Sequence, residues 1–294
     1  MDKKTNPTAA ADVLVTGSEG FIGSPLCRRL ESEGYRVVGA DLRLGHDLSL
    51  GGALDDFPDF RVAVHLAART YIPDSLKDPG AFLRTNTGST LQVLEACRRR
   101  GARMILASTY LYGVPQVLPV DEEHPLAAPH PYALSKQAAE ALCRVYAQAG
   151  LVPVIIFRPF NVFGPGQDER FLLPSFLKQW SSGTVRLQDP EPRRDYLYID
   201  DMVNAYMAAI RLPFQGLEVV NIGSGISYSV REVCSLLSSM MPGEGEVIFS
   251  GQIRENEIPE TRAAIGKARE LLGWQPEFSM EEGLRLTVEH FLSA

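Results

Sequence analysis

The sequence predicts an α/β protein built on a doubly wound parallel sheet. Short apolar runs rich in β-branched residues alternate, over residues 12–158, with longer stretches whose apolar residues recur at helical spacing. A glycine-rich turn joins the first strand to the first helix. Such alternation is typical of parallel strands covered by helices on both faces. Ligands of these sheets lie beyond the carboxyl ends of the strands, so residues just after strands are the candidates for function.

The expected elements follow in chain order. Strands are expected at 13–16, 35–40, 61–66, 102–107 and 154–157, and a strand at 219–222 is expected to return to the sheet. Helices are expected at 20–33, 87–100, 132–148, 171–180, 263–272 and 279–292. Three arginines end the helix at 87–100, just before Gly101. This indicates basic charge at a helix C-terminus ahead of a glycine cap, and not a phosphate site.

Composition excludes several classes of function. The 294 residues are 45% hydrophobic and 22% charged, enough for a full core in one large domain or two closely packed ones. The net charge of −7 predicts no general attraction to nucleic acid or anionic membranes. The four cysteines and five histidines show no metal-ligand spacing, and no apolar run approaches membrane-spanning length. Residues 1–11 are expected to be a disordered leader, and the protein to be cytoplasmic.

The glycine-rich turn predicts a diphosphate site. Gly17 permits a tight turn off the first strand, Gly20 lets backbone amides approach a diphosphate, and Gly23 lets the helix lie close to the sheet. The free amides of Phe21 and Ile22 at the start of the helix would face an anion that the helix dipole favours.

Asp41 supports the same interpretation. It follows the second strand about twenty residues beyond the glycines, where a carboxylate can accept both hydroxyls of an adenosine ribose. The turn and Asp41 together predict a dinucleotide site. The alternative is an ordinary strand–turn–helix with an aspartate on the surface.

A second group of residues could carry acid–base chemistry. Ser108 follows the fourth strand, and Tyr132 and Lys136 lie one helical turn apart. A nearby ammonium should stabilise the phenolate and lower the tyrosine pKa from about 10 toward neutrality. The serine hydroxyl could then orient a substrate alcohol. The alternative is a tyrosine and a lysine with no role beyond the helix surface.

These motifs resemble those of the extended short-chain dehydrogenase/reductases, and more narrowly of the nucleotide-sugar epimerase/dehydratase branch. The resemblance rests on segments 16–23, 65–68, 108–113, 132–136, 158–166 and 194–201, in the order of that family, and covers residues 12 to about 290. It implies a Rossmann domain for NAD at 12–158, with a returning segment near 195–223. It also implies a smaller nucleotide-sugar domain at 159–194 and 224–294.

The resemblance also implies the site residues. Catalysis would use Ser108, Tyr132 and Lys136. The cofactor would be bound by a larger set, namely Gly17, Gly20, Phe21, Ile22, Gly23, Asp41, Leu42, Arg43, Asp47, Leu48, Leu66, Ala67, Ala68, Tyr132, Lys136, Phe160 and Val162. The nucleotide-sugar would contact Thr70, Ser108, Thr109, Tyr132, Asn161, Arg194 and Arg254. Guanidinium groups suit its diphosphate. The alternative for Arg194 is an ion pair with Asp195 or Asp200. No metal is expected.

Two points stay open at this level. Asp41 would repel a 2′-phosphate and favours NAD, whereas Arg43 could accommodate one, which keeps NADP possible. Relatives that dehydrate or decarboxylate the sugar carry acidic residues one or two places after the catalytic Ser/Thr. Thr109 and Tyr110 stand there instead, which disfavours 4,6-dehydration.

Three interpretations of the function then remain. The resemblance favours 4-epimerisation with retained NAD. Residues 70–79 resemble the corresponding stretch of reductases of GDP-4-keto-6-deoxy-mannose, which would exchange their cofactor. A non-catalytic NAD-binding sensor is the third interpretation. A homodimer through the helices at 87–100 and 132–148 is also implied by the resemblance.

Overall fold

The computed structural model describes residues 11–254 and 257–293. The expected leader therefore lies outside the described residues, apart from Ala11, the first residue of strand β1. The chain divides into two compact units, which are described separately. The first comprises Met1–Leu111, Leu126–Arg158 and Tyr206–Val220, and the second comprises Tyr112–Pro125, Pro159–Ala205 and Asn221–Ala294.

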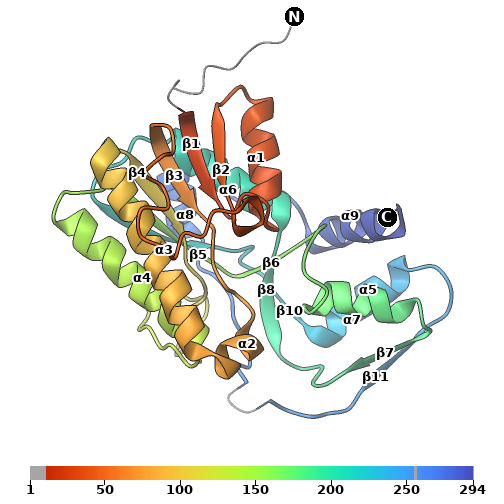
Figure 1. Ribbon diagram of the computed structural model, residues 1–294. Helices are drawn as coiled ribbons and strands as arrows, with labels where there is room; N and C mark the ends of the chain where they lie inside the picture. The colour runs from red at the N-terminus through yellow and green to blue at the C-terminus, as the bar shows by residue number, and fades with distance from the viewer. Residues whose placement is uncertain (1–10, 255–256, 294) are drawn as a thin grey trace, which may run out of the picture. The chain divides into compact units, whose positions relative to one another are not determined.

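A six-stranded sheet with the order β2-β1-β3-β4-β5-β9 forms the centre of the first unit (Figure 1). Its strands are β1 (Ala11–Thr16), β2 (Val37–Ala40), β3 (Phe60–His65), β4 (Arg103–Ala107), β5 (Val154–Pro159) and β9 (Leu217–Ile222). The pairings of β1 with β2 and β3, of β3 with β4, and of β4 with β5 are parallel. The predicted fold class is confirmed, and the strand expected at 219–222 does return to the sheet, beside β5.

Helices lie against this sheet in the first unit. They are α1 (Gly23–Ser32), α2 (Ile72–Lys77), α3 (Pro79–Arg100), α4 (Pro131–Gln148) and the C-terminal part of α6 (Ile199–Arg211), with a 3₁₀ turn at Leu42–Leu44. Helices α3 and α4 pack side by side (Figure 1). Ile156 belongs to the core beneath α3 and α4, whereas the ring of its neighbour Phe157 contacts Tyr206 of α6. Adjacent strand residues thus face opposite sides, so both faces of the sheet are covered.

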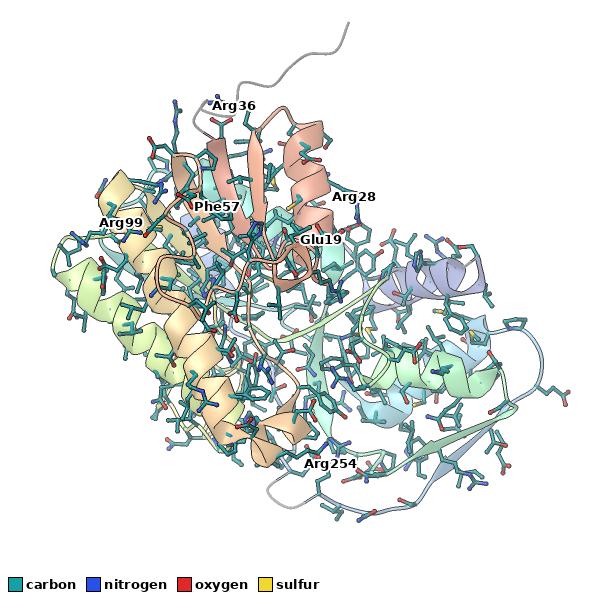
Figure 2. All side chains as sticks on the ribbon, viewed as in Figure 1. Glu19, Arg28, Arg36, Phe57, Arg99 and Arg254 are labelled. Atoms are coloured by element: carbon teal, nitrogen blue, oxygen red, sulfur yellow. The ribbon has the colours of Figure 1, made fainter. Side chains whose placement is uncertain are left out.

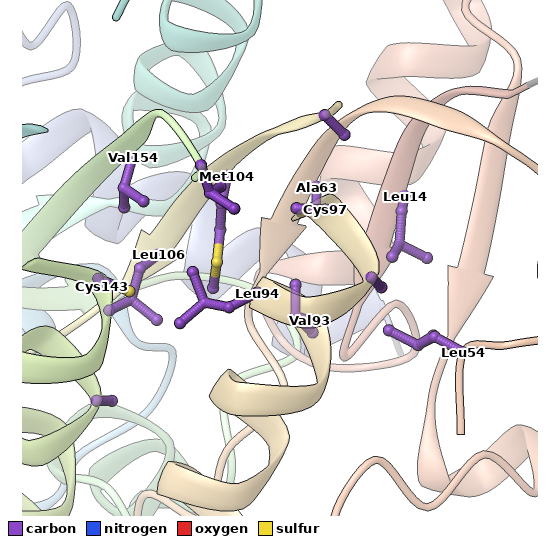
Figure 3. Packing of buried hydrophobic residues seen from close by; sticks show 14 of the residues in the cluster. Leu14, Leu54, Ala63, Val93, Leu94, Cys97, Met104, Leu106, Cys143 and Val154 are labelled. Atoms are coloured by element: carbon purple, nitrogen blue, oxygen red, sulfur yellow. The ribbon is translucent and has the colours of Figure 1, made fainter. Parts of the chain in front are cut away.

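The core beneath α3 and α4 is a continuous apolar cluster (Figure 3). Leu14, Ala63, Met104 and Val154 come from four neighbouring strands, and each has no exposed surface. Residues of the two helices complete the cluster, namely Val93, Leu94, Cys97, Ala139 and Cys143. Burial of so many apolar side chains anchors the two helices to the sheet, and with them the residues that they carry.

Helix α3 is two turns longer than expected. The predicted start at Thr87 is wrong, because Asp78 caps the helix by accepting a hydrogen bond from the N–H of Ala81 (3.0 Å), and Pro79 occupies the first helical position. Proline is favourable there because its missing N–H would have no partner in the helix.

The C-terminal end of α3 is as expected. Gly101 caps it with a φ of 62°. Arg98 pairs with Glu95, Arg99 with Asp55, and Arg100 donates to two backbone carbonyls before β3 (Arg99 is labelled in Figure 2). The three arginines thus form ion pairs and hydrogen bonds with the end of α3 and with the segment before β3.

The second unit is built from small sheets and helices. Its three-stranded sheet has the order β10-β8-β6, and β11 pairs with β7 in a second sheet. The strands are β6 (Asn161–Phe163), β7 (Thr184–Leu187), β8 (Arg193–Tyr198), β10 (Ser227–Ser229) and β11 (Glu246–Phe249). The helices are α5 (Leu172–Trp180), the start of α6, α7 (Val230–Met240), α8 (Gly266–Leu272) and α9 (Met280–Ser293). The helices expected at 171–180, 263–272 and 279–292 are present with shifted ends.

Residues 112–125 fall in the second unit, although the expected first domain ran from 12 to 158 without interruption. Val120 donates its N–H to the carbonyl of Arg262 (2.8 Å), and its own carbonyl accepts the N–H of Ala264 (2.8 Å). Glu122 accepts the N–H of Asn221 (2.7 Å). These bonds join segments that lie 99 to 144 positions apart, so local sequence patterns could not reveal them.

Two buried aspartates organise the second unit. Asp195 accepts hydrogen bonds from the N–H groups of Ser224, Gly225 and Ala263. Asp201 accepts from two N–H groups of the segment before α9, at 2.8 and 3.2 Å, and burial raises its pKa to about 6. Both carboxylates therefore accept hydrogen bonds from loop N–H groups that no helix or strand would otherwise satisfy.

Three further observations concern the described residues only. Within them, no helix is both long and apolar enough to cross a membrane. The same residues contain no cluster of three or more His, Cys, Asp or Glu side chains that could hold a metal ion. All four cysteines are free thiols.

Candidate active site

The glycine-rich loop after β1 is closed by contacts that only glycine permits. Gly17 has a φ of 71°, and a Cβ there would lie 2.8 Å from the backbone nitrogen of Ala67. A Cβ on Gly23 would lie 2.0 Å from the carbonyl oxygen of Gly17, which also accepts the N–H of Gly20 at 3.0 Å. Side chains at 17 or 23 would therefore force the loop off both the sheet and the helix.

Helix α1 begins at Gly23, directly after this loop. Its N-cap residue is Ile22, whose apolar side chain makes no capping hydrogen bond. Its first turn also lacks acidic residues. Uncapped N–H groups at the positive end of a helix dipole form a site for an anion such as a diphosphate. Phe21 and Ile22, expected to bind the cofactor, lie at this point.

Asp41 lies beside the same loop. Its two carboxylate oxygens accept the N–H of Glu19 (3.1 Å) and of Arg43 (2.8 Å), and the Arg43 guanidinium donates to the carbonyl of Glu19 (2.8 Å). Figure 2 labels Glu19 in this loop. The contacts place Asp41 and Arg43 together next to the glycines, where an adenosine ribose would follow the diphosphate. These residues fit a dinucleotide.

The other residues of the first unit that are expected to bind the cofactor follow strands β2 and β3. The N–H of Leu66 donates to the Thr16 carbonyl (3.1 Å) and that of Ala67 to the Thr16 hydroxyl (3.3 Å), so the segment 66–68 runs beside the end of β1. Leu42 is exposed and Leu48 is buried. Asp47 accepts from the N–H and hydroxyl of Ser49, which lowers the pKa of its carboxyl.

Tyr132 and Lys136 lie in the first two turns of α4. The helix starts at Pro131, with the ring of His130 accepting the N–H of Ala133 as a cap (3.1 Å). Lys136 is only 3% exposed, and burial lowers its pKa to about 8 even though Glu140 acts in the opposite direction.

Burial raises the pKa of Tyr132, and a hydrogen bond with Thr109 offsets this only in part. The lowered pKa expected for Tyr132 from Lys136 was therefore wrong in direction, because desolvation of the buried phenol is the largest influence on it.

His65 supports the site as a neutral residue. Its ring bonds the hydroxyls of Thr16 (2.7 Å) and Thr90 (3.2 Å), and it is 1% exposed. Burial, followed by the charge of Lys136, lowers its pKa to about 3. The sequence showed no metal-ligand spacing around this histidine. The structure shows a packing role that ties the ends of β1 and β3 to α3 and adds no second cation beside Lys136.

Asn86 was missed by the sequence analysis. Its amide accepts the N–H of Arg69 (2.8 Å) and donates to the carbonyl of Arg69 (3.0 Å) and to Ser135 Oγ (2.8 Å). The Ser135 hydroxyl in turn donates to the Tyr132 carbonyl (2.7 Å). One buried side chain thus links the segment that carries Thr70 to the turn that carries Tyr132. Asn86 lies just before the helix predicted at 87–100, so no local pattern marked it; only the longer observed helix α3 includes it.

Ser108 and Thr109 follow β4, as expected, but their hydroxyls have different partners. The hydroxyl of Ser108 donates to Glu140 (2.6 Å), whereas that of Thr109 is hydrogen-bonded to Tyr132. Glu140 also pairs with Arg158 through two bonds of 3.0 and 2.7 Å. The sequence analysis named neither Glu140 nor this role of Arg158.

The remaining predicted residues lie in the second unit. Phe160 is buried and donates its N–H to Ile222, Asn161 is exposed at the start of β6, and Val162 follows it. Arg194 forms an ion pair with Glu257, and Arg254, in the loop after β11 (Figure 2), donates to Gln188 (2.9 Å).

The ion pair of Arg194 was not the one considered from sequence. Asp195 is buried and bonded to backbone, so a partner 63 positions away takes its place. Arg254 accepts the N–H of Glu257 at its carbonyl (3.2 Å), so both arginines lie at one loop. Their guanidinium groups nevertheless have different partners.

Comparison with known proteins assigns a family. The model of the "NAD dependent epimerase/dehydratase family" matches residues 13–223. The chain is 32% identical to a UDP-glucose 4-epimerase of Mycolicibacterium smegmatis, over 95% of this chain and 97% of that protein. It is 31% identical to a GDP-6-deoxy-D-mannose reductase of Pseudomonas aeruginosa, over 93% of this chain and 94% of that protein.

A solved structure shares the whole architecture. It is that of TunA, described as an NAD dependent NDP-hexosamine 5,6-dehydratase involved in tunicamycin biosynthesis. The identity is 34%, the TM-score is 0.87, and the match covers 97% of this chain and 98% of TunA. The names of these three proteins all refer to nucleotide-sugars, but each names a different reaction.

Proposed function

The chain belongs to the NAD dependent epimerase/dehydratase family, and from this premise we propose that it is a nucleotide-sugar 4-epimerase that retains NAD. It is an NAD-dependent enzyme of the extended short-chain dehydrogenase/reductases. The proposed substrate is a nucleotide-activated hexose, with UDP-glucose as the first compound to test, because a UDP-glucose 4-epimerase is similar over nearly the whole chain.

The observation that carries this proposal is the set of side chains around Tyr132. The phenol of Tyr132 interacts with the hydroxyl of Thr109 and lies one helical turn from the buried Lys136. Both residues belong to the unit whose glycine-rich loop after β1 fits a dinucleotide. Bound NAD would accept a hydride from C4 of the sugar and return it. Tyr132 would take the proton of the C4 hydroxyl and give it back after the 4-keto sugar has turned, and Lys136 would stabilise the phenolate.

4,6-Dehydration is disfavoured by the residues that follow β4 and by the partners of the nearby Glu140. Positions 109 and 110 are Thr and Tyr, and the nearby Glu140 is 1% exposed and already bonded to Ser108 and Arg158. The carboxylate oxygens of Glu140 are therefore already occupied by Arg158 and Ser108.

Binding of the nucleotide-sugar would use Thr70, Asn161, Arg194 and Arg254. The arginines would hold its diphosphate, since planar guanidinium groups match phosphate oxygens. The first unit would therefore bind the cofactor and the second would supply most groups for the nucleotide-sugar. We further propose a homodimer through α3 and α4, acting in the cytoplasm.

A 4-keto reductase is the second candidate, and two observations favour it. One relative is a GDP-6-deoxy-D-mannose reductase, and the guanidinium of Arg43 lies beside Asp41, where a 2′-phosphate would lie. This enzyme would release its cofactor after each turnover.

Purification without added cofactor separates the two candidates. For an epimerase we expect about one NAD per chain after extraction, and interconversion of UDP-glucose and UDP-galactose by NMR with no added nicotinamide. Tyr132→Phe should remove nearly all turnover and leave NAD affinity within a few fold. Protein free of nicotinamide, active only on a 4-keto sugar with added NAD(P)H, would establish the reductase instead. Tight NAD binding without turnover of any UDP-, GDP- or dTDP-sugar would favour the sensor.

A further inference from the structure

Helix α4 begins with a histidine as its N-cap residue. His130 precedes the helix with extended backbone (φ −150°, ψ 162°), and its carbonyl accepts the N–H of Leu134 at 3.0 Å. Its ring nitrogen Nδ1 accepts the N–H of Ala133 at 3.1 Å. Pro131, the first helical residue, has no N–H to satisfy. The imidazole is thus the side-chain cap of the first turn, which is the turn that contains Tyr132.

The same imidazole lies against the ring of Tyr132. The two rings are within 3° of parallel, with centroids 6.0 Å apart, and Phe82 of α3 meets the phenol ring edge-on at 6.3 Å. Phe82 is 2% exposed, whereas His130 is half-buried and can exchange a proton with solvent. Two rings therefore contact the phenol, and one of them can change its charge.

An imidazole must be neutral to act as this cap. A ring nitrogen accepts an N–H only while it carries no proton, so the bond from Ala133 requires the tautomer with its proton on Nε2. Protonation would turn Nδ1 into a donor that faces the N–H donor of Ala133. It would also place a positive charge at the start of a helix, where the helix dipole disfavours cations. Protonated His130 therefore cannot cap α4, whereas an asparagine at the same position would keep its acceptor at any pH.

The charged groups of the first unit near the start of α4 leave the titration of His130 unperturbed. The contact of Phe82 with Tyr132 places the first turns of α3 beside those of α4, and α2 also packs against α4. The titratable and charged residues of α2, of these turns of α3 with its cap, of the start of α4 and of the segments after β3 and β4 are Arg69, Tyr71, Asp74, Lys77, Asp78, Arg84, Tyr110, Tyr132, Lys136 and Glu140. Among the described residues, none of these groups acts on the pKa of His130, which burial lowers and a hydrogen bond with its own backbone raises.

We propose that His130 is a positioning residue that makes the placement of Tyr132 depend on pH. This inference rests on the proposed function, in which Tyr132 exchanges a proton with the sugar. While the imidazole is neutral, it caps the first turn of α4 and holds the phenol in one position. In acid the cap is lost, the first turn frays, and the phenol is no longer held. Lys136 lies one turn further along α4 and is buried, so NAD binding should persist where turnover falls.

Three variants separate the cap from its charge. His130→Asn keeps a short acceptor that caps helices and does not titrate, and His130→Ala has no cap at any pH. The matched control is His124→Asn. The Nε2 of His124 also accepts a backbone N–H, that of Gln116 at 3.1 Å, but it does so away from any helix start. NAD binding by calorimetry at pH 7.5 shows that each variant is folded.

The first readout needs no substrate. It is the free energy of unfolding in urea between pH 5 and pH 8, taken as the difference between wild type and His130→Asn, so that His65 and Lys136 contribute equally to both proteins. Burial lowers the pKa of His130 below its ordinary value of 6.5, so the native state binds fewer protons than the unfolded state and loses stability as the pH falls below 6.5. Wild type should therefore lose more stability in acid than His130→Asn. An NMR titration of the His130 ring should have its midpoint below pH 6.5.

The second readout is the pH dependence of the single-turnover reduction of bound NAD by UDP-glucose. The phenol of Tyr132 titrates in every variant, so the rate of His130→Asn divided by that of wild type isolates the imidazole. This ratio should be close to one at pH 7.5 and rise at least about fivefold by pH 5.5. At pH 7.5 His130→Ala should be slower than wild type by about 2- to 30-fold, as expected for loss of a helix cap. His124→Asn should keep the wild-type pH profile.

Other results would overturn the proposal. One is a ratio of rates that does not change with pH, and another is a rate of His130→Asn as low as that of His130→Ala. A wild-type rate that rises in acid relative to His130→Asn would show that the charge of the imidazole, which favours the phenolate, outweighs the loss of the cap. A wild-type enzyme that reduces no NAD with any nucleotide-sugar would refute the proposed function. The unfolding measurement would still decide on the cap, since equal losses of stability in acid for wild type and His130→Asn would refute a titrating cap.

Discussion

Removing the arginine of the buried Glu140–Arg158 pair should destabilise the enzyme severely. Arg158→Met keeps the aliphatic stem and deletes the guanidinium, which leaves a carboxylate that is 1% exposed with Ser108 as its remaining close donor and Arg144 at 3.7 Å. Breaking one partner of a buried pair costs about 3–5 kcal/mol. At about 1.4 kcal/mol per tenfold, the unfolded fraction should rise about 10²- to 10⁴-fold.

Urea unfolding followed by circular dichroism measures this loss. The midpoint should fall by at least about 1 M, given slopes of about 1–3 kcal/mol/M. The double variant Arg158→Met/Glu140→Leu should recover most of the stability, because it leaves no unpaired charge in the core. The matched control is Arg98→Met, which removes an exposed Arg–Glu pair of similar length (2.8 Å) and should cost less than about 1 kcal/mol.

Two results would refute this reasoning. One is a loss in Arg158→Met no larger than in the Arg98→Met control, which would mean that burial adds nothing to the pair. The other is a double variant as unstable as the sum of the two single variants, which would mean that the two side chains do not act on each other.

Three more predictions concern the cofactor site and its lysine. Burial holds the pKa of Lys136 near 8, below its ordinary value of 10.5, so the native state binds fewer protons than the unfolded state between these values. Burying Lys136 therefore lowers the free energy of unfolding fully below pH 8, and this loss fades as the pH rises toward 10.5. Urea unfolding should show that Lys136→Met is at least as stable as wild type at neutral pH, and that the difference in stability closes at alkaline pH. The variant should nevertheless lose turnover. Asp41→Ser should shift the NAD:NADP affinity ratio at least about tenfold toward NADP in calorimetry, and adding Arg43→Ala should cancel the gain; no shift would show that Asp41 does not face the ribose. Gly23→Ala should abolish NAD binding, since its Cβ would lie 2.0 Å from the Gly17 carbonyl oxygen, whereas Gly51→Ala, with no atom within 4 Å, should bind NAD normally; equal binding by both would contradict the loop geometry.

The predictable parts of this fold depend on local patterns. Apolar runs located the six strands of the central sheet. A strand that is buried on both faces needs apolar side chains at nearly every position, so its sequence is easily recognised. The three glycines marked the loop for the same kind of reason: backbone atoms approach so closely at Gly17 and Gly23 that no side chain fits. Helix α3 shows where such reasoning fails, since the helix was expected to begin at Thr87 although Asp78 caps it and Pro79 begins it.

Within the site, the sequence determined which residues are available, and the tertiary structure decided what each one does. Tyr132 and Lys136 could be paired in advance because helical spacing alone brings them together. The partners of Ser108, Thr109 and Arg194 could not, because Glu140, Tyr132 and Glu257 lie 32, 23 and 63 positions away. Contacts at that separation arise only when strand ends and helices pack, and burial then sets the pKa values that local spacing had suggested in the wrong direction.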